Sequence, residues 1–321
     1  MIEPTFRHKD LLASLLIGIL YCLNSPCLIA QQLSWTADDQ GYELTENGET
    51  RLFYQRATKD KDGQYPRANY IHPLYDLNGD VITEDFPEDH LHHRGIFWTW
   101  HQLLVDGKRV ADPWISDGIV WEVTRVETSV LSEEMAALDA QINWVVDGEP
   151  VVEESLRLHY ERVDPELYRL TVEVWLKPLA KKVQIGGSED PKGYGGFSPR
   201  IRLTETTGFF DQNGPVTPQE LPVAGGPWMN ITQQGPEDPG VVILGEPDRL
   251  PSYQGWILRR KNSMQNMAFP GREPITLSEK EPYLHFRNQL LVHQGLQTAE
   301  IDLFYRDFIQ TEPTTDQALA D

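Results

Sequence analysis

The strongest constraint on the fold is an alternation of apolar and polar residues between positions 118 and 186. The segments GIVWEVTRVET, ALDAQINWVV, VVEESLRLHYER and LYRLTVEVWLKP all follow it, with breaks at Gly148 and Pro165. A period of two turns one face of a strand toward a core and the other toward solvent. The pattern therefore predicts a meander of antiparallel strands.

Turn signals and further strand patterns extend this prediction over most of the chain. Residues 187–240 are rich in Gly, Pro and Asn, which indicates long loops between short strands such as 199–204. The strand pattern returns at 241–245, 256–260 and 283–293. Three dipeptides are hairpin signals: Asn78-Gly79, Asp106-Gly107 and Asp147-Gly148. We therefore expect one large all-β domain over residues 31–310.

The two ends of the chain differ from this domain. Residues 1–30 combine a weakly basic start with an apolar run over 11–23, which is typical of a secretory signal peptide cleaved after Ala30. The run is shorter than the ~20 residues of a bilayer span. Apolar residues at helical spacing predict a short C-terminal helix from about Thr298, and we expect residues 311–321 to form a disordered tail. The mature chain would be periplasmic or secreted, with no membrane span.

Charge and cysteine content narrow the classes of ligand. The formal net charge is −21, which repels nucleic acid and anionic lipid headgroups. Both cysteines lie inside the predicted signal peptide, so the mature chain would form neither a disulfide nor a thiolate metal site. The expected ligand is neutral, cationic, or held by a local exception to the overall charge.

Histidine is concentrated in one short stretch. Residues 89–101 read DHLHHRGIFWTWH, and His72 lies just upstream, so five of the nine histidines fall between 72 and 101. Histidine titrates near neutral pH and is the commonest metal ligand. The cluster therefore indicates proton transfer, metal binding, or both. The alternative is that some of these histidines are hydrogen-bonded structural residues.

The spacing of the cluster allows a pair of metal ligands but matches no standard metal motif. On a strand, His90 and His92 would share a face and could bind one divalent metal, while His93 would point to the other side. The following glutamate of a cupin, the H-E-x-x-H motif and the H-x-D/E motif are all absent. His90 and His92 are therefore a candidate metal pair without a standard signature.

Arg94 and Gly95 follow directly. Arg94 could grip a hydroxyl pair or a carboxylate, with Gly95 allowing close backbone approach. The alternative is a salt bridge from Arg94 to Asp89 or Asp85. Trp98 and Trp100 would share a strand face, either packed in the core or stacked on a ligand.

Later segments add further candidates. The glycine-rich segment 192–203 reads as a turn leading into a strand and not as a phosphate loop. Tyr194 and Arg200 could line a pocket there, or the segment could be a structural turn. His293 ends a strand that also carries His285, and it is the stronger candidate of the two. Glu153 and Glu154 begin an alternating strand, where solvent exposure is the ordinary explanation.

The segment IHPLYDLNGDVITEDFPEDHLHHRGIFWTW resembles the hallmark of a bacterial family often labelled "methane oxygenase PmoA". Its members share I-H-P-x-Y-x-x-x-G and then D-H-x-H-H-R-G-[IL]-[FW], and the similarity continues through the GYGG segment to the strand with His293. The membrane methane monooxygenase subunit needs several spanning helices. This chain offers one short apolar run, so methane oxidation is not expected.

That family is similar to the galactose-mutarotase-like proteins. The resemblance implies a large antiparallel β-supersandwich whose concave face presents histidines and acids to a sugar, and it implies a carbohydrate role. The mutarotase N-H-x-Y-F motif is absent, so simple aldose epimerisation is not implied.

These observations give one leading hypothesis and two alternatives. The first is an exported enzyme that acts on a glycoside or keto-sugar by histidine acid/base chemistry, as an epimerase, lyase or hydrolase. The alternatives are a non-catalytic carbohydrate-binding protein and a metal-dependent oxygenase or lyase. The first hypothesis assigns His93 and His293 as the acid/base pair, with His92 beside them. The substrate would be bound by His72, Arg94, Trp98, Trp100, Tyr194 and Arg200.

Overall fold

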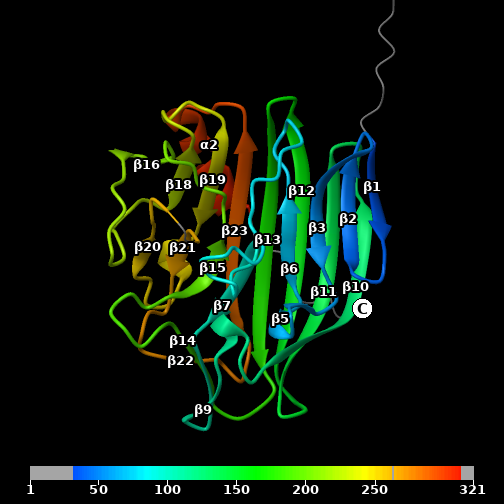
Figure 1. The fold of residues 1–321 in the computed structure, drawn as a ribbon, viewed down its shortest axis with the longest axis vertical. Coiled ribbons are helices and arrows are strands. Elements are labelled where there is room, and N and C mark those ends of the chain that lie inside the picture. The colour runs from blue at the N-terminus through cyan, green and yellow to red at the C-terminus, as the bar shows by residue number, and fades with distance from the viewer. Residues whose placement is uncertain (1–31, 262–263, 312–321) are drawn as a thin grey trace, which may run out of the picture. The chain divides into compact units, whose positions relative to one another are not determined.

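The computed structural model describes residues 32–261 and 264–311, which belong to one compact unit. Residues 1–30, where a signal peptide is predicted, and residues 312–321 of the predicted tail lie outside the described residues. Strands and loops dominate the described part (Figure 1).

A nine-stranded sheet forms the larger layer, and every adjacent pair in it is antiparallel. Its centre is the meander that the alternating segments predicted. The turn at Asp147-Gly148 has left-handed φ values of 51° and 82°, which suit a two-residue hairpin. In spatial order the strands are β10 (Val120–Val130), β11 (Met135–Val146), β12 (Glu149–Asp164), β13 (Leu167–Pro178), β23 (Leu284–His293), β19 (Gly240–Gly245), β18 (Trp228–Thr232), β16 (Gly208–Asp211) and β17 (Gly214–Pro215).

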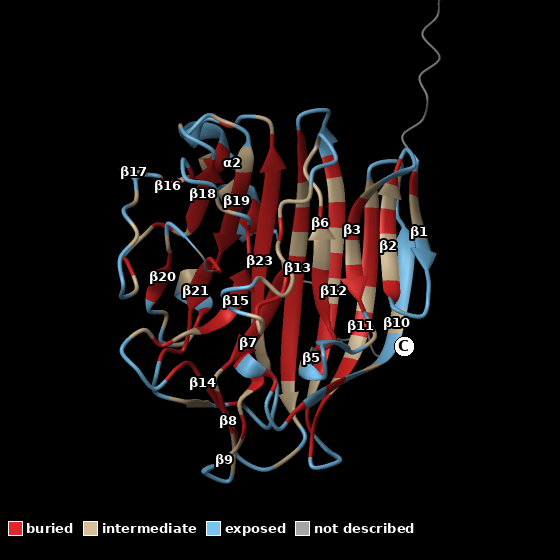
Figure 2. Ribbon diagram, viewed as in Figure 1, coloured by how far each residue is buried: buried red, intermediate tan, exposed pale blue. Residues whose placement is uncertain are grey.

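A six-stranded antiparallel sheet packs against this layer. Side chains from the facing sides of both sheets form one apolar core. The central strands of both sheets are largely buried, whereas the edge strand β10 is mostly exposed (Figure 2). Arg162 on the larger sheet forms a buried ion pair with Glu46 on the smaller one. In spatial order the strands are β1 (Leu33–Ala37), β2 (Gly41–Glu46), β3 (Glu49–Gln55), β6 (Tyr70–Leu74), β7 (Ile96–Trp100) and β15 (Gly195–Pro199).

β15 corrects the expectation for the glycine-rich segment. The strand begins with two of the glycines, Gly195 and Gly196, whereas the predicted strand at 199–204 is reduced to a single bridge between Ile201 and Thr83. A Cβ on Gly196 would lie 2.7 Å from the Phe269 ring, and the φ of Gly196 is +100°. The glycines therefore allow close packing of neighbouring segments.

Smaller sheets extend the two layers. Asp106-Gly107 is the turn of a hairpin, as predicted. The strand predicted at 256–260 ends at Ile257. A four-stranded sheet contains β22 (Ile275–Thr276), β14 (Val183–Gly186), β8 (Gln102–Val105) and β9 (Lys108–Ala111), and two pairs are β20 (Gly255–Ile257) with β21 (Asn266–Ala268) and β4 (Lys59–Lys61) with β5 (Gln64–Arg67).

The C-terminal helix α2 (Thr298–Gln310) covers part of the outer face of the larger sheet. It starts with a capping box between Gln297 and Glu300, which satisfies backbone N–H groups of the first turn. Ile301 and Phe308 pack beside Leu291, whose neighbours on β23 face the core between the sheets. The architecture confirms the predicted all-β sandwich with a short C-terminal helix. Among the described residues, no helix is long and apolar enough to cross a membrane.

Candidate functional site

His90, His92 and His93 lie in consecutive turns before β7. The backbone N–H of His90 donates to the carbonyl of Pro87 (3.0 Å), and that of His93 donates to the carbonyl of His90 (2.8 Å). Because the chain turns here and is not extended, the three rings gather instead of alternating. The expectation that His93 points away from the other two is therefore wrong.

We call these three residues the histidine cluster. The rings of His90 and His93 stack with centroids 4.7 Å apart and planes 3° from parallel. His92 meets His93 edge-on at 4.6 Å and lies 5.6 Å from His90. The Tyr65 ring lies 5.8 Å from His92. The side chain of His90 is 44% exposed, whereas His93 is 3% exposed, so the cluster runs from the surface inward.

Arg200 holds the histidine cluster in place from its buried side. Its guanidinium is 2% exposed, and Nε donates to Glu84 (2.8 Å). One terminal nitrogen lies 3.1 Å from His93 Nδ1, and the other donates to both oxygens of Asp89 (2.9 and 3.0 Å). Asp89 in turn lies 2.6 Å from His90 Nδ1. A planar fork of donors fixes several partners at once, so Arg200 positions both His93 and Asp89.

These contacts determine where protons reside. An arginine has only donors, so His93 Nδ1 accepts and the neutral ring carries its proton on Nε2. Burial is the main reason that the pKa of His93 is well below its usual value, and the charge of Arg200 adds to it. Burial likewise lowers the pKa of His92 to about 4. Burial of Asp89 opposes ionisation, but the hydrogen bond from His90 and the charge of Arg200 lower its pKa overall.

Arg94 and Gly95 hold the loop in place. Arg94 is fully buried, donates to the carbonyls of Leu91 (3.1 Å) and Tyr65, and lies 3.6 Å from Asp85. The sequence predicts that Arg94 either grips a ligand or forms a salt bridge with Asp89 or Asp85. The structure shows the salt bridge to Asp85. A Cβ on Gly95 would lie 2.1 Å from the Ile71 carbonyl oxygen on β6, so only glycine fits there.

An aromatic wall adjoins the cluster. Trp114 meets His93 edge-on at 5.9 Å and stacks between His101 (5.2 Å) and Tyr194 (5.7 Å). It lies in a short 3₁₀ turn, Pro113–Ile115, which Asp112 caps. Sequence reasoning missed Trp114. The order Asp-Pro-Trp, with a capping residue before Pro, is a turn signal that could have drawn attention to it.

Trp98 and Trp100 lie in the core, 2% and 0% exposed, so neither presents a face to a ligand here. The indole N–H of Trp98 donates to Glu154 (2.7 Å). Glu154 also accepts from Asn69 (2.7 Å) and Trp144 (2.6 Å) and is completely buried. The expectation that Glu154 is exposed is therefore wrong.

The remaining histidine candidates lie elsewhere. His72 is on β6, with Nδ1 2.9 Å from Thr83 Oγ1. His293 ends β23, with Nε2 3.1 Å from Asn230 Oδ1, and His285 lies on the same strand. No interaction in the described ranges joins His293 to the histidine cluster.

The metal prediction has limited support in the geometry. His90 and His92 are close enough to share a small ligand, but His90 Nδ1 is engaged by Asp89. Within residues 32–261 and 264–311, no group of three or more His, Cys, Asp or Glu side chains is arranged to hold a metal ion. The Asp89–His90 pair, a carboxylate hydrogen-bonded to an imidazole, is an arrangement that can transfer protons.

Fold and site together define a class: a two-sheet β sandwich with an imidazole-rich site on the outer side of the smaller sheet. The chain belongs to a family of unknown function, DUF6807, whose model matches residues 41–305. The match covers the histidine cluster and every strand of the two large sheets except β1. No curated protein matches the chain.

Proposed function

We propose that the protein is an exported carbohydrate-active enzyme whose histidine cluster performs acid/base chemistry on a keto-sugar. The observation that carries the proposal is the hydrogen-bonded Asp89–His90 pair at the exposed end of the cluster, beside the neutral rings of His92 and His93. The acidic chain supports a neutral substrate. The sugar class follows from the family resemblance described above.

His90 is the base in this proposal. Asp89 accepts from Nδ1–H of His90 and is itself held by Arg200, which leaves Nε2 of the half-exposed ring able to accept a proton. A carboxylate that orients an imidazole in this way is the arrangement of known proton-transfer sites. We therefore propose His90, in place of His93 and His293, for the acid/base role.

His92 is the electrophile. A neutral imidazole N–H can donate to an oxygen on which charge develops, without giving up its proton. When His90 takes the proton from the carbon beside the carbonyl, the electron pair moves into the carbonyl and the oxygen becomes an enolate, stabilised by His92. Protonation of the enolate from the opposite face by water, with release of the first proton from His90 to solvent, gives an epimer. Loss of a leaving group from the next carbon gives a lyase product.

Hydrogen exchange tests this step whatever the final product is. The protein is incubated with methyl 3-keto-glucoside in D₂O, and deuterium at the carbons beside the carbonyl is followed by NMR. We expect exchange above the buffer rate, and a loss of roughly 10²-fold or more in His90→Asn and His92→Asn. His285→Gln is the matched control and should exchange like the wild type.

Four outcomes would contradict the proposal. Exchange no faster than in buffer would remove the catalytic role, and sugar binding without exchange would favour a binding protein. Exchange that a chelator abolishes and a divalent metal restores would favour a metal-dependent reaction. Wild-type exchange in both cluster variants would place the chemistry elsewhere in the chain.

A further inference from the structure

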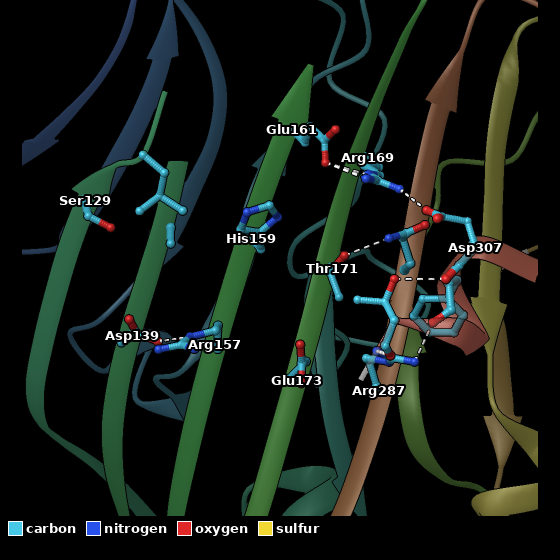
Figure 3. A pocket seen from close by; sticks show the side chains of 15 residues that line it. Ser129, Asp139, Arg157, His159, Glu161, Arg169, Thr171, Glu173, Arg287 and Asp307 are labelled. Carbon is cyan, nitrogen blue, oxygen red and sulfur yellow. Dashed lines mark hydrogen bonds and ion pairs between the residues drawn. The ribbon is translucent and has the colours of Figure 1, made fainter. Parts of the chain in front are cut away.

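A groove lined mainly by charged and polar side chains lies on the opposite side of the sandwich, on the outer face of the nine-stranded sheet (Figure 3). Its volume is about 490 Å³, which is within the usual range of ligand sites. Strands β10–β13 and β23 form the floor, and residues 307, 308 and 311 at the end of α2 form a wall. Figure 3 shows His159 in the middle of the floor.

Strand register orders the floor into rows. Asp139, Arg157, Glu173 and Arg287 lie opposite one another on β11, β12, β13 and β23. The next row toward α2's wall residue Asp307 is uncharged or weakly basic: Ala137, His159, Thr171 and Gln289. With strands ~4.8 Å apart, each row spans about 14 Å. That length exceeds one sugar ring.

Most charges in the groove are paired with one another. Arg157 Nε lies 2.5 Å from Asp139, and Arg169 bridges Glu161 (2.7 Å) and Asp307 (2.9 Å). Arg287 pairs instead with Glu246 (3.1 Å), which does not line the groove. Because each arginine has a carboxylate partner, the groove offers hydrogen-bond donors and acceptors side by side. Such a surface suits a neutral ligand with many hydroxyl groups.

The second row retains hydrogen-bonding capacity. Gln289 is 4% exposed, and its Nε2 donates to Thr171 Oγ1 (2.8 Å). Its Oε1 is buried and has no hydrogen-bond partner in the described part of the chain. Buried polar atoms are usually satisfied, so a ligand hydroxyl would complete this site. Leu131 and Phe308 supply apolar contact for the carbon skeleton.

We infer that this groove is a second site, which binds a neutral carbohydrate chain. Paired guanidinium and carboxylate groups match vicinal hydroxyls, each of which both donates and accepts. The net charge of −21 disfavours anionic polysaccharides. The inference depends on the groove alone and is independent of the chemistry at the histidine cluster.

Affinity gel electrophoresis tests the inference. The protein is run through gels that contain hydroxyethyl cellulose, xylan, laminarin, dextran or, as the anionic comparison, alginate. We expect at least one neutral polymer to retard the wild type. Ser129→Trp should fill the rim of the groove from an exposed position and weaken retention by roughly tenfold or more. Thr128→Trp is the control, because Thr128 is exposed on the same strand and does not line the groove.

Arg157→Lys gives a second, milder probe, because it keeps the charge and loses the forked geometry. It should also weaken retention, and circular dichroism should show that both variants are folded. The variant His92→Asn should be retained like the wild type, which separates this site from the proposed catalytic one. No retardation by any neutral polymer, retardation by alginate alone, or full retention of Ser129→Trp would overturn the inference.

Discussion

Replacing His293 with glutamine should make the fold less sensitive to acid. His293 is 2% exposed, and the side-chain amide of Asn230 donates to Pro236, which leaves the Asn230 oxygen to accept from His293 Nε2. The other ring nitrogen is buried and has no hydrogen-bond partner among the described residues. A second proton would therefore be placed where nothing accepts it. Burial accordingly lowers the pKa of His293 to about 4.

The size of the effect follows from linkage. The ordinary pKa of histidine is 6.5, so between the two pKa values the unfolded chain binds more protons and acid favours unfolding. The contribution of neutral His293 to the free energy of unfolding is fully present above the unfolded pKa and is lost as the pH falls toward the folded pKa. Between pH 7 and pH 5, protonation of His293 in the unfolded chain should lower the free energy of unfolding by about 2 kcal/mol.

Urea unfolding followed by tryptophan fluorescence measures this difference. Glutamine is neutral at both pH values and can still donate to Asn230. We expect the free energy of unfolding of His293→Gln to fall by about 2 kcal/mol less than that of the wild type between pH 7 and pH 5. Equal losses in the two proteins would refute the reasoning. Because a base with this pKa is weak at neutral pH, the variant should also keep the deuterium exchange proposed for the histidine cluster.

Three further substitutions test the structure. Glu154→Ala leaves three buried N–H donors unpaired and should lower the free energy of unfolding by several kcal/mol, at ~1–3 kcal/mol per group; an unchanged urea midpoint would argue against the network. Gly95→Ala places a Cβ against the Ile71 carbonyl and should abolish the deuterium exchange while the protein stays folded by circular dichroism, so full activity would contradict the loop geometry. Arg287→Met removes donors to the last carbonyls of α2 and should raise amide exchange over 298–310 alone; unchanged protection there would show that the helix docks without it.

Glu153 and Glu154 show what an alternating sequence pattern can and cannot predict. Alternation requires adjacent residues on a strand to face opposite sides, so one of the two had to point toward the core. The pattern could not show how a buried carboxylate would be satisfied. Two of its three partners, Asn69 and Trp98, are 85 and 56 residues away in sequence. Only the packing of the two sheets brings them together.

The histidine cluster was found from composition, but its geometry was not. Alternation along an extended DHLHHRG segment predicts that His93 and His90 lie on opposite faces. The turns that unite them are fixed by long-range contacts: Arg200 is 107 residues from His93 and 111 from Asp89. The glycine-rich segment before Arg200 is predicted as a turn leading into a strand, whereas Gly195 and Gly196 lie inside β15 and pack closely against Trp100 and Phe269.

The groove separates what local sequence determines from what it does not. Hairpins fix the register of β11, β12 and β13, so the row of Asp139, Arg157 and Glu173 follows from short-range pairing. Without a neighbouring wall, the same residues would form an ordinary solvent-exposed face of the sheet. That wall is α2, whose end is held by Arg287 through the carbonyls of Phe308 and Thr311. The polar rows are therefore encoded locally, whereas the ligand-sized hollow depends on the docking of the last helix.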